Sequence, residues 1–191
     1  MTSAGQAPEV FARRPKRADA RRNYDALIAA AREAFAENGA SASLEDVARR
    51  AGVGIGTLYR NFPSRRHLFE AVYVEEVRAL SRSAEDLAEL PPWDALVAWL
   101  HRFVAYVATK RALAEQLLQD SEIFTSCRTE IYAAGEPLLR RGQDAGVVRA
   151  DIGFDDVVRL ISGLTMGQFS SPGQRDRVLG VALDGLRVTV R

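Results

Sequence analysis

The segment 43–66, SLEDVARRAGVGIGTLYRNFPSRR, constrains this chain more than any other. Its pattern predicts a short helix, a glycine-containing turn and a second short helix. Ser43 suits the N-cap of the first helix, because its hydroxyl can accept a hydrogen bond from a free backbone N–H. Asp46 places a carboxylate near the positive end of the helix dipole. Gly52 is expected to end the helix, since glycine adopts left-handed backbone angles without steric cost.

The second short helix, about residues 55–61, is only two turns long and has a polar outward face. We expect the apolar residues Ile55, Leu58 and Phe62 to point inward. Arginine and asparagine can hydrogen-bond base edges, hydroxyl groups suit phosphate oxygens, and a glycine lets the backbone approach a groove floor. The pattern therefore predicts a helix-turn-helix that binds DNA. Base-edge or groove-floor contacts are expected from Ile55, Gly56, Arg60 and Asn61, and phosphate contacts from Ser43, Thr57, Tyr59 and Arg65.

The stretch EDVARRAGVGIGTLYRNFPSRRHLFEAV resembles the DNA-binding signature of the tetracycline-repressor (TetR) family of transcriptional regulators. The matching positions are Val47, Ala48, Ala51, Gly52, Val53, Gly56, Thr57, Leu58, Tyr59, Phe62, Ser64 and Leu68. Two positions depart from the pattern. Gly54 stands where the family often has Ser or Thr, which weakens the cap of the second helix, and Arg65 replaces the usual Lys but keeps its charge.

The rest of the chain is predicted to be all-α, because apolar residues recur at helical spacing and no strand alternation is present. We expect a three-helix DNA-binding head followed by a helical-bundle domain for ligand binding and dimerisation. The expected boundaries are a mobile basic arm over 1–18, the head over 19–66 and the bundle over 67–191. Helices are expected over 24–38, 65–87, 93–108, 113–118, 121–145, 154–169 and 174–188, with a turn or extended link over 146–151.

Charge is unevenly distributed along the chain. Residues 1–70 hold twelve Lys and Arg against eight Asp and Glu, a net charge of +4, and the remainder carries −3. A basic head on a slightly acidic body suits a nucleic-acid-binding protein. The arginines and lysine of the arm have two interpretations: a solvated tail, or an arm that contacts phosphates or enters a minor groove.

Other classes of protein find little support in the sequence. The single cysteine, Cys127, excludes an internal disulfide and a thiolate metal cluster, and we expect it to be a buried structural thiol. The two histidines, His67 and His101, belong to no metal-binding or catalytic motif. No apolar run approaches the roughly 20 residues that span a bilayer. We therefore expect a cytoplasmic protein that is not an enzyme and uses no metal or cofactor.

The last two predicted helices are apolar around more of their surface than one internal contact requires. We expect them to form a homodimer through a four-helix interface, which would present two recognition helices to a palindromic operator. The TetR resemblance implies the same arrangement, and it implies that a small molecule releases the repressor from DNA.

The central helices supply the residues for a small apolar or amphipathic ligand, although ordinary core packing explains each of them as well. These candidates are Trp99, Phe103, Tyr106, Gln116, Phe124, Tyr132, Met166 and Phe169. The alternative function is a helical protein that binds or sequesters a small molecule and carries a vestigial DNA-binding head.

Overall fold

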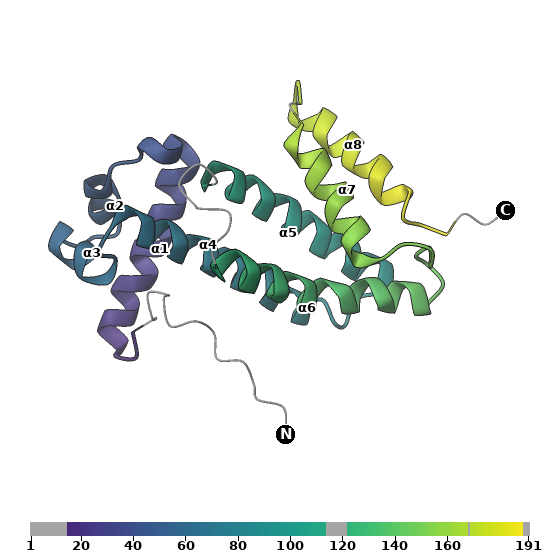
Figure 1. Cartoon of the computed structure of the whole chain (residues 1–191), viewed down its shortest axis with the longest axis horizontal. Helices are drawn as coiled ribbons and strands as arrows, with labels where there is room; N and C mark the ends of the chain where they lie inside the picture. The colour runs from purple at the N-terminus through teal and green to yellow at the C-terminus, as the bar shows by residue number, and fades with distance from the viewer. Residues whose placement is uncertain (1–14, 114–121, 168, 189–191) are drawn as a thin grey trace. The chain divides into compact units, whose positions relative to one another are not determined.

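The computed structural model describes residues 15–113, 122–167 and 169–188, and within them the chain is all-α, as predicted. The helices are α1 (Ala18–Asn38), α2 (Leu44–Arg50), α3 (Ile55–Asn61), α4 (Arg65–Glu85), α5 (Pro92–Leu113), α6 (Glu122–Asp144), α7 (Phe154–Met166) and α8 (Pro172–Asp184) (Figure 1). The largest differences from the expected bounds are four: α1 begins before residue 24, α5 runs past residue 108, α7 ends at Met166 rather than 169, and α8 ends before residue 188. The helix expected over 113–118 falls almost entirely outside the described residues.

The chain divides into two compact units. The head unit comprises the described residues up to Glu76 with those of 109–128, and the helical unit comprises 77–108 with the described residues from 129 onward. These compact units meet within α4, and the boundary of a DNA-binding domain after residue 66 stays a prediction. The units meet there because the first half of α4 packs on α1: the rings of Phe35 and Phe69 stack with centroids 4.1 Å apart, and Arg32 pairs with Glu76.

The head unit has a continuous apolar core. Leu27, Phe35, Leu58 and Phe62 are almost completely buried, and the Tyr24 ring lies against Phe62 at 5.2 Å. Ser64 caps α4 as its sequence position suggests, because its hydroxyl accepts a hydrogen bond from the backbone N–H of His67. Burial of these rings fixes α3 to α1, which a helix of seven residues could not achieve by its own hydrogen bonds.

The helical unit is built around Trp99. Its indole is fully buried, donates a hydrogen bond to the Leu80 carbonyl at 3.3 Å and lies 5.6 Å from the Phe103 ring. Phe154 packs against it from α7 at 5.7 Å, and α6 approaches through Gly135. Glycine is required there because a methyl group would come within 2.2 Å of the Phe154 ring and 2.7 Å of the Trp99 ring.

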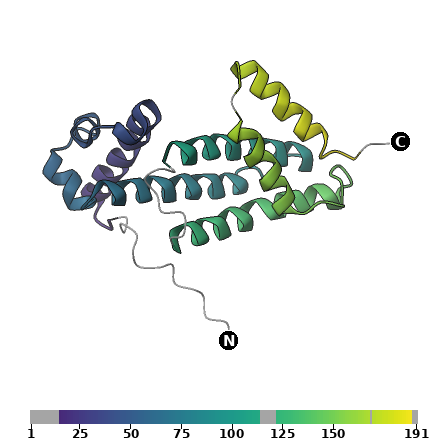
Figure 2. The same ribbon diagram turned by 45° about the horizontal axis from the view of Figure 1, so that its top comes forward.

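The segment after α8 is held by an antiparallel bridge that the sequence did not predict. Val148 pairs with Arg187, the Arg149 N–H donates to the Leu186 carbonyl at 2.9 Å, and the Arg187 guanidinium lies 4.3 Å from the Trp93 ring centroid. We call residues 147–149 and 186–188 the C-terminal clasp. It explains why α8 stops at Asp184, because the following residues use their backbone groups for the bridge. Figure 2 shows the same helices from a second direction.

We predict that Gly135→Ala destabilises the protein by about 1–3 kcal/mol, because the added methyl group overpacks the Trp99–Phe154 contact. Thermal unfolding followed by circular dichroism measures the effect. Gly56→Ala is the matched control, since a methyl group at that helical glycine meets nothing within 4 Å. Equal melting temperatures for Gly135→Ala and the control would contradict this account of the packing.

Candidate nucleic-acid interface

The start of α2 has the predicted cap. Ser43 Oγ accepts a hydrogen bond from the Asp46 N–H at 3.3 Å, and its hydroxyl donates to Glu45 Oε2 at 2.7 Å. The same hydroxyl was predicted to meet a phosphate. In the free protein this hydroxyl therefore already donates a hydrogen bond to the Glu45 carboxylate. A phosphate could accept that hydrogen bond only by displacing the carboxylate.

The turn between α2 and α3 follows the sequence prediction. Gly52 has φ +68°, a left-handed conformation that glycine adopts without strain. The Val53 N–H closes the turn on the Ala48 carbonyl at 3.0 Å. Gly54 then occupies the N-cap of α3 and offers no side-chain cap, as expected from its departure from the family pattern.

The α3 helix separates its buried and exposed residues sharply. Leu58 and Phe62 are fully buried, as predicted. Ile55 is 37% exposed, so the prediction that it faces inward is wrong; only two apolar anchors fit beneath so short a helix. Tyr59 is 47% exposed, and Arg60 lies on the same outward surface. Ile55, Gly56, Tyr59 and Arg60 are thus brought together on one exposed face, and Thr57 is half-buried beside them.

Two of the predicted contact residues make hydrogen bonds within the head unit. The Asn61 amide donates to the Thr57 carbonyl at 2.8 Å, one turn back along α3. The Arg65 guanidinium donates to the Ala42 carbonyl at 2.5 Å and thereby ties the start of α4 to the residue before the α2 cap. Both side chains are half-buried. A role at DNA stays a prediction for both.

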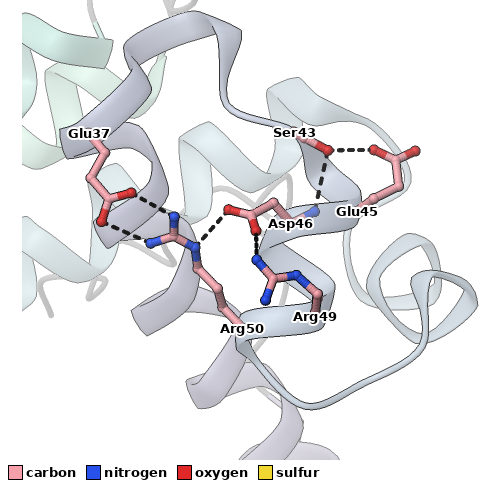
Figure 3. A network of polar contacts seen from close by, with 6 residues as sticks. All are labelled: Glu37, Ser43, Glu45, Asp46, Arg49 and Arg50. Atoms are coloured by element: carbon pink, nitrogen blue, oxygen red, sulfur yellow. Dashed lines mark hydrogen bonds and ion pairs between the residues drawn. The ribbon is translucent and has the colours of Figure 1, made fainter.

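A chain of ion pairs, which sequence inspection missed, joins α1 to α2 (Figure 3). Arg50 donates from its two terminal nitrogens to the two carboxylate oxygens of Glu37, at 2.9 and 2.6 Å. Its Nε donates to Asp46 at 2.7 Å, and Asp46 also pairs with Arg49. The i,i+4 spacing of Asp46 and Arg50 is a local signal that could have been found. The Glu37 pair has no such signal, because the two residues meet only through tertiary packing.

Hydrogen bonds at this site lower the pKa values of three carboxyl groups. Hydrogen bonds from Arg50 hold the pKa of Glu37 below its ordinary value of 4.5. Hydrogen bonds from Arg50 and then Arg49 likewise lower the pKa of Asp46 from 3.8. A hydrogen bond from the Ser43 hydroxyl lowers the pKa of Glu45. All three carboxylates are therefore ionised at neutral pH, and two of them, Glu37 and Asp46, pair with Arg49 and Arg50.

The candidate ligand residues are distributed over both units, and their role in binding a ligand stays a prediction. Trp99, Phe103, Tyr106 and Tyr132 belong to the helical unit, where the first three are buried in the ring cluster and Tyr132 donates a hydrogen bond to Asp155. Phe124 belongs to the head unit, between Tyr73 at 5.0 Å and the ammonium group of Lys110 at 5.5 Å. Burial lowers the pKa of Lys110 there. Phe169 is half-buried, whereas Gln116 and the Met166 side chain fall outside the described residues.

The described residues offer few groups for metal binding or redox chemistry. Cys127 is buried, as predicted, and His67 Nδ1 shares a hydrogen bond of 2.7 Å with Ser64. Over these parts of the chain, no group of three or more His, Cys, Asp or Glu side chains is placed to hold a metal ion. No helix within the described residues is long and apolar enough to cross a membrane.

Comparison with known proteins agrees with this geometry. Residues 27–72 match the family described as bacterial regulatory proteins, tetR family. Residues 91–188 match the C-terminal domain of transcriptional regulators described as SbtR-like. The HTH-type transcriptional regulator UidR of Escherichia coli (strain K12) is 27% identical over 150 residues, covering 74% of this chain and 76% of UidR.

Solved structures give the same result for the whole fold. The chain is similar to the TetR transcriptional regulator SCO0520 from Streptomyces coelicolor, with 41% identity, a TM-score of 0.76, and coverage of 87% of this chain and 99% of that one. It is also similar to a TetR transcription regulatory protein from Mycobacterium vanbaalenii, with 32% identity, a TM-score of 0.74, and coverage of 91% and 100%.

The Glu37–Arg50 pair predicts a pH dependence of stability. Because the pKa of Glu37 is lowered by folding, the folded protein binds fewer protons than the unfolded chain below pH 4.5. The contribution of the pair is fully present above that pH and is lost on acidification. We expect the free energy of unfolding, measured with urea at a series of pH values, to fall less steeply in Glu37→Gln than in the wild type.

The matched control is Glu33→Gln, which changes an exposed carboxylate one turn earlier on α1. It should follow the wild-type profile through the acid range. Identical profiles for Glu37→Gln and Glu33→Gln would show that the ion pair contributes nothing to the stability of the head unit.

Proposed function

Because the chain belongs to the tetR family of bacterial regulatory proteins, we propose that it is a ligand-responsive, homodimeric repressor that binds a palindromic operator through α3. The observation that carries this proposal is the division of α3 into a buried side and an exposed side. Leu58 and Phe62 hold the helix in the core, while Tyr59 and Arg60 lie on its exposed side. Such a face suits the major groove of DNA.

The proposed contacts follow from the position of each side chain. Ile55, Gly56 and Arg60 lie on the exposed face and would meet base edges or the groove floor, Arg60 by hydrogen bonds to a guanine. Tyr59 would meet a phosphate, as would Thr57. Further contacts are proposed for Ser43, Asn61 and Arg65, each of which would keep or exchange the hydrogen bond that it makes in the free protein. The arm over residues 1–18 remains a candidate for phosphate contacts.

The apolar surface of α7 and α8 supports the proposed dimer. Val181 on α8 is 74% exposed and Leu160 on α7 is 41% exposed, and the two helices pack side by side (Figure 1). A methyl group at Gly163 or Gly180 would meet nothing within 4 Å. Open glycines beside exposed aliphatic side chains allow helices of a second copy to approach closely, and two copies would present two α3 helices to one operator.

Regulation would follow from a difference in affinity. A small molecule that binds more tightly to the conformation with wrongly spaced heads shifts the population away from the operator, and DNA weakens ligand binding by the same factor. We place this activity in the cytoplasm, where both DNA and metabolites are available.

We expect Arg60→Ala to weaken binding to the operator by about 1–3 kcal/mol and to reduce discrimination against unrelated duplexes, because a base contact is lost. Fluorescence anisotropy with an operator selected from random duplexes, and with a scrambled duplex at the same salt concentration, measures both effects. Arg140→Ala on α6 is the control, since Arg140 pairs with Glu136 far along the chain from the head. A wild-type protein that binds every duplex equally would instead favour the sequestering alternative.

We expect Val181→Asp to yield monomers at micromolar concentration, because a dimer would bury an unpaired carboxylate. Size-exclusion chromatography with light scattering gives the mass. Ala29→Asp, at an exposed position of α1, introduces the same charge in the head unit and should leave the dimer intact. The proposed interface is wrong if Val181→Asp keeps the mass of a dimer.

A further inference from the structure

A groove in the helical unit runs between the second half of α4 and α6. We call it the α4–α6 groove; its volume is about 590 Å³, and the residues that matter most in it are Arg78, Ser81, Arg82, Ala133, Pro137 and Arg141. This volume is in the range of small-molecule sites. None of the aromatic residues of the Trp99 cluster lines it, so it differs from the ligand site that the sequence suggested.

One buried polar group of the α4–α6 groove lacks the partner that such groups normally have. Ser81 Oγ is buried and, among the described residues, has no hydrogen-bond partner. Buried polar atoms are nearly always hydrogen-bonded, and an exception at a groove calls for an explanation. On the α6 side, Pro137 has no N–H to donate to the Ala133 carbonyl, which is the usual acceptor four residues earlier in a helix. A bound molecule with hydrogen-bonding groups would give the Ser81 hydroxyl a partner.

The charge of the groove favours an anion. Arg78, Arg82 and Arg141 line it against two carboxylates, Glu85 and Glu130, which leaves one positive charge in excess. A single excess charge suits a monoanion better than a dianionic phosphate. Guanidinium groups also match the planar geometry of a carboxylate, which they bind with two parallel hydrogen bonds.

One of these arginines is held in place by neutral partners. Arg141 donates to the Ala88 carbonyl at 2.8 Å and to the Leu90 carbonyl, both in the segment that follows α4. Carbonyl groups fix the position of the guanidinium without cancelling its charge. Arg141 therefore presents a positioned cation at the groove, a feature that a site for an anion needs.

The remaining lining residues are apolar and mostly small. Ala84 and Ala88 on the α4 side face Ala134 and Leu138 on α6. Short side chains leave room for a ligand with an apolar body, whose burial would add to its affinity. From these observations we propose that the α4–α6 groove binds a small amphipathic carboxylic acid, with the carboxylate at the arginines and the apolar body along the alanines.

The proposal deepens the proposed function by naming the chemical class of the effector, and it rests on that function only for the effect on DNA. Helix α4, which begins directly after the helix-turn-helix, supplies half of the groove. A ligand that prefers one arrangement of α4 would thereby bias the head. Binding of the ligand itself is measured without DNA, so that its failure can be told from a failure of operator recognition.

The test is isothermal titration of the protein with octanoate and phenylacetate, each compared with its neutral amide. We expect both carboxylates to bind at least roughly tenfold more tightly than octanamide and phenylacetamide, because only the acids bring a negative charge and two equivalent oxygens to pair with a guanidinium group. Arg82→Gln should weaken the carboxylates by a similar factor and leave the amides unchanged. Ser81→Ala should weaken all four compounds, because it removes the buried hydroxyl.

Arg140→Gln is the matched control, because Arg140 lies on α6 outside the α4–α6 groove and should bind the acids as the wild type does. Circular dichroism establishes that each variant is folded, and Arg82 is exposed, so its replacement should be tolerated. The proposal is overturned if neither carboxylate binds at millimolar concentration, if acids and amides bind equally, or if Arg82→Gln retains wild-type affinity for the acids.

Discussion

Burial of Leu58 and Phe62 is the interaction on which the head unit depends. A helix of seven residues is too short to persist through its own hydrogen bonds, so α3 exists because these two side chains are held in the core. The contact of Phe62 with Tyr24 connects this anchoring to α1. Ile55, Gly56, Tyr59 and Arg60 form the exposed face of the same helix. The face that we propose to contact DNA is therefore separate from the anchors that hold α3 in the core.

Features that depend on neighbours in the sequence were predictable. The Ser43 cap, the left-handed Gly52 and the inward position of Leu58 all follow from rules that act within one or two turns. The Arg50–Glu37 pair and the Arg65–Ala42 hydrogen bond were not predictable, because each joins elements whose relative placement is decided by the core. Ile55 could not be placed for the same reason. The spacing of apolar residues along α3 marks Ile55 as a candidate for burial, but it does not say whether the neighbouring helix reaches far enough to cover that side chain.

The aromatic residues of the helical unit show why a pocket is harder to predict than a core. Trp99, Phe103 and Tyr132 are the kinds of side chain that line ligand sites, and the sequence cannot tell whether they surround a hollow or fill one. The structure decides this through partners that come from distant segments, above all Phe154 and Gly135. Conversely, the α4–α6 groove is lined by alanines and arginines that resemble an ordinary helix surface in the sequence, and only the packing of α4 beside α6 makes them a hollow.

The C-terminal clasp places the two tryptophans of the chain in very different surroundings. Trp99 is sealed in the core, whereas Trp93 is half-buried beneath a guanidinium group that belongs to the clasp. Release of the segment after α8 would take the guanidinium group away from the Trp93 ring, while Trp99 would keep its surroundings in the core. A change in the emission of Trp93 alone would thus report loosening near the end of the chain.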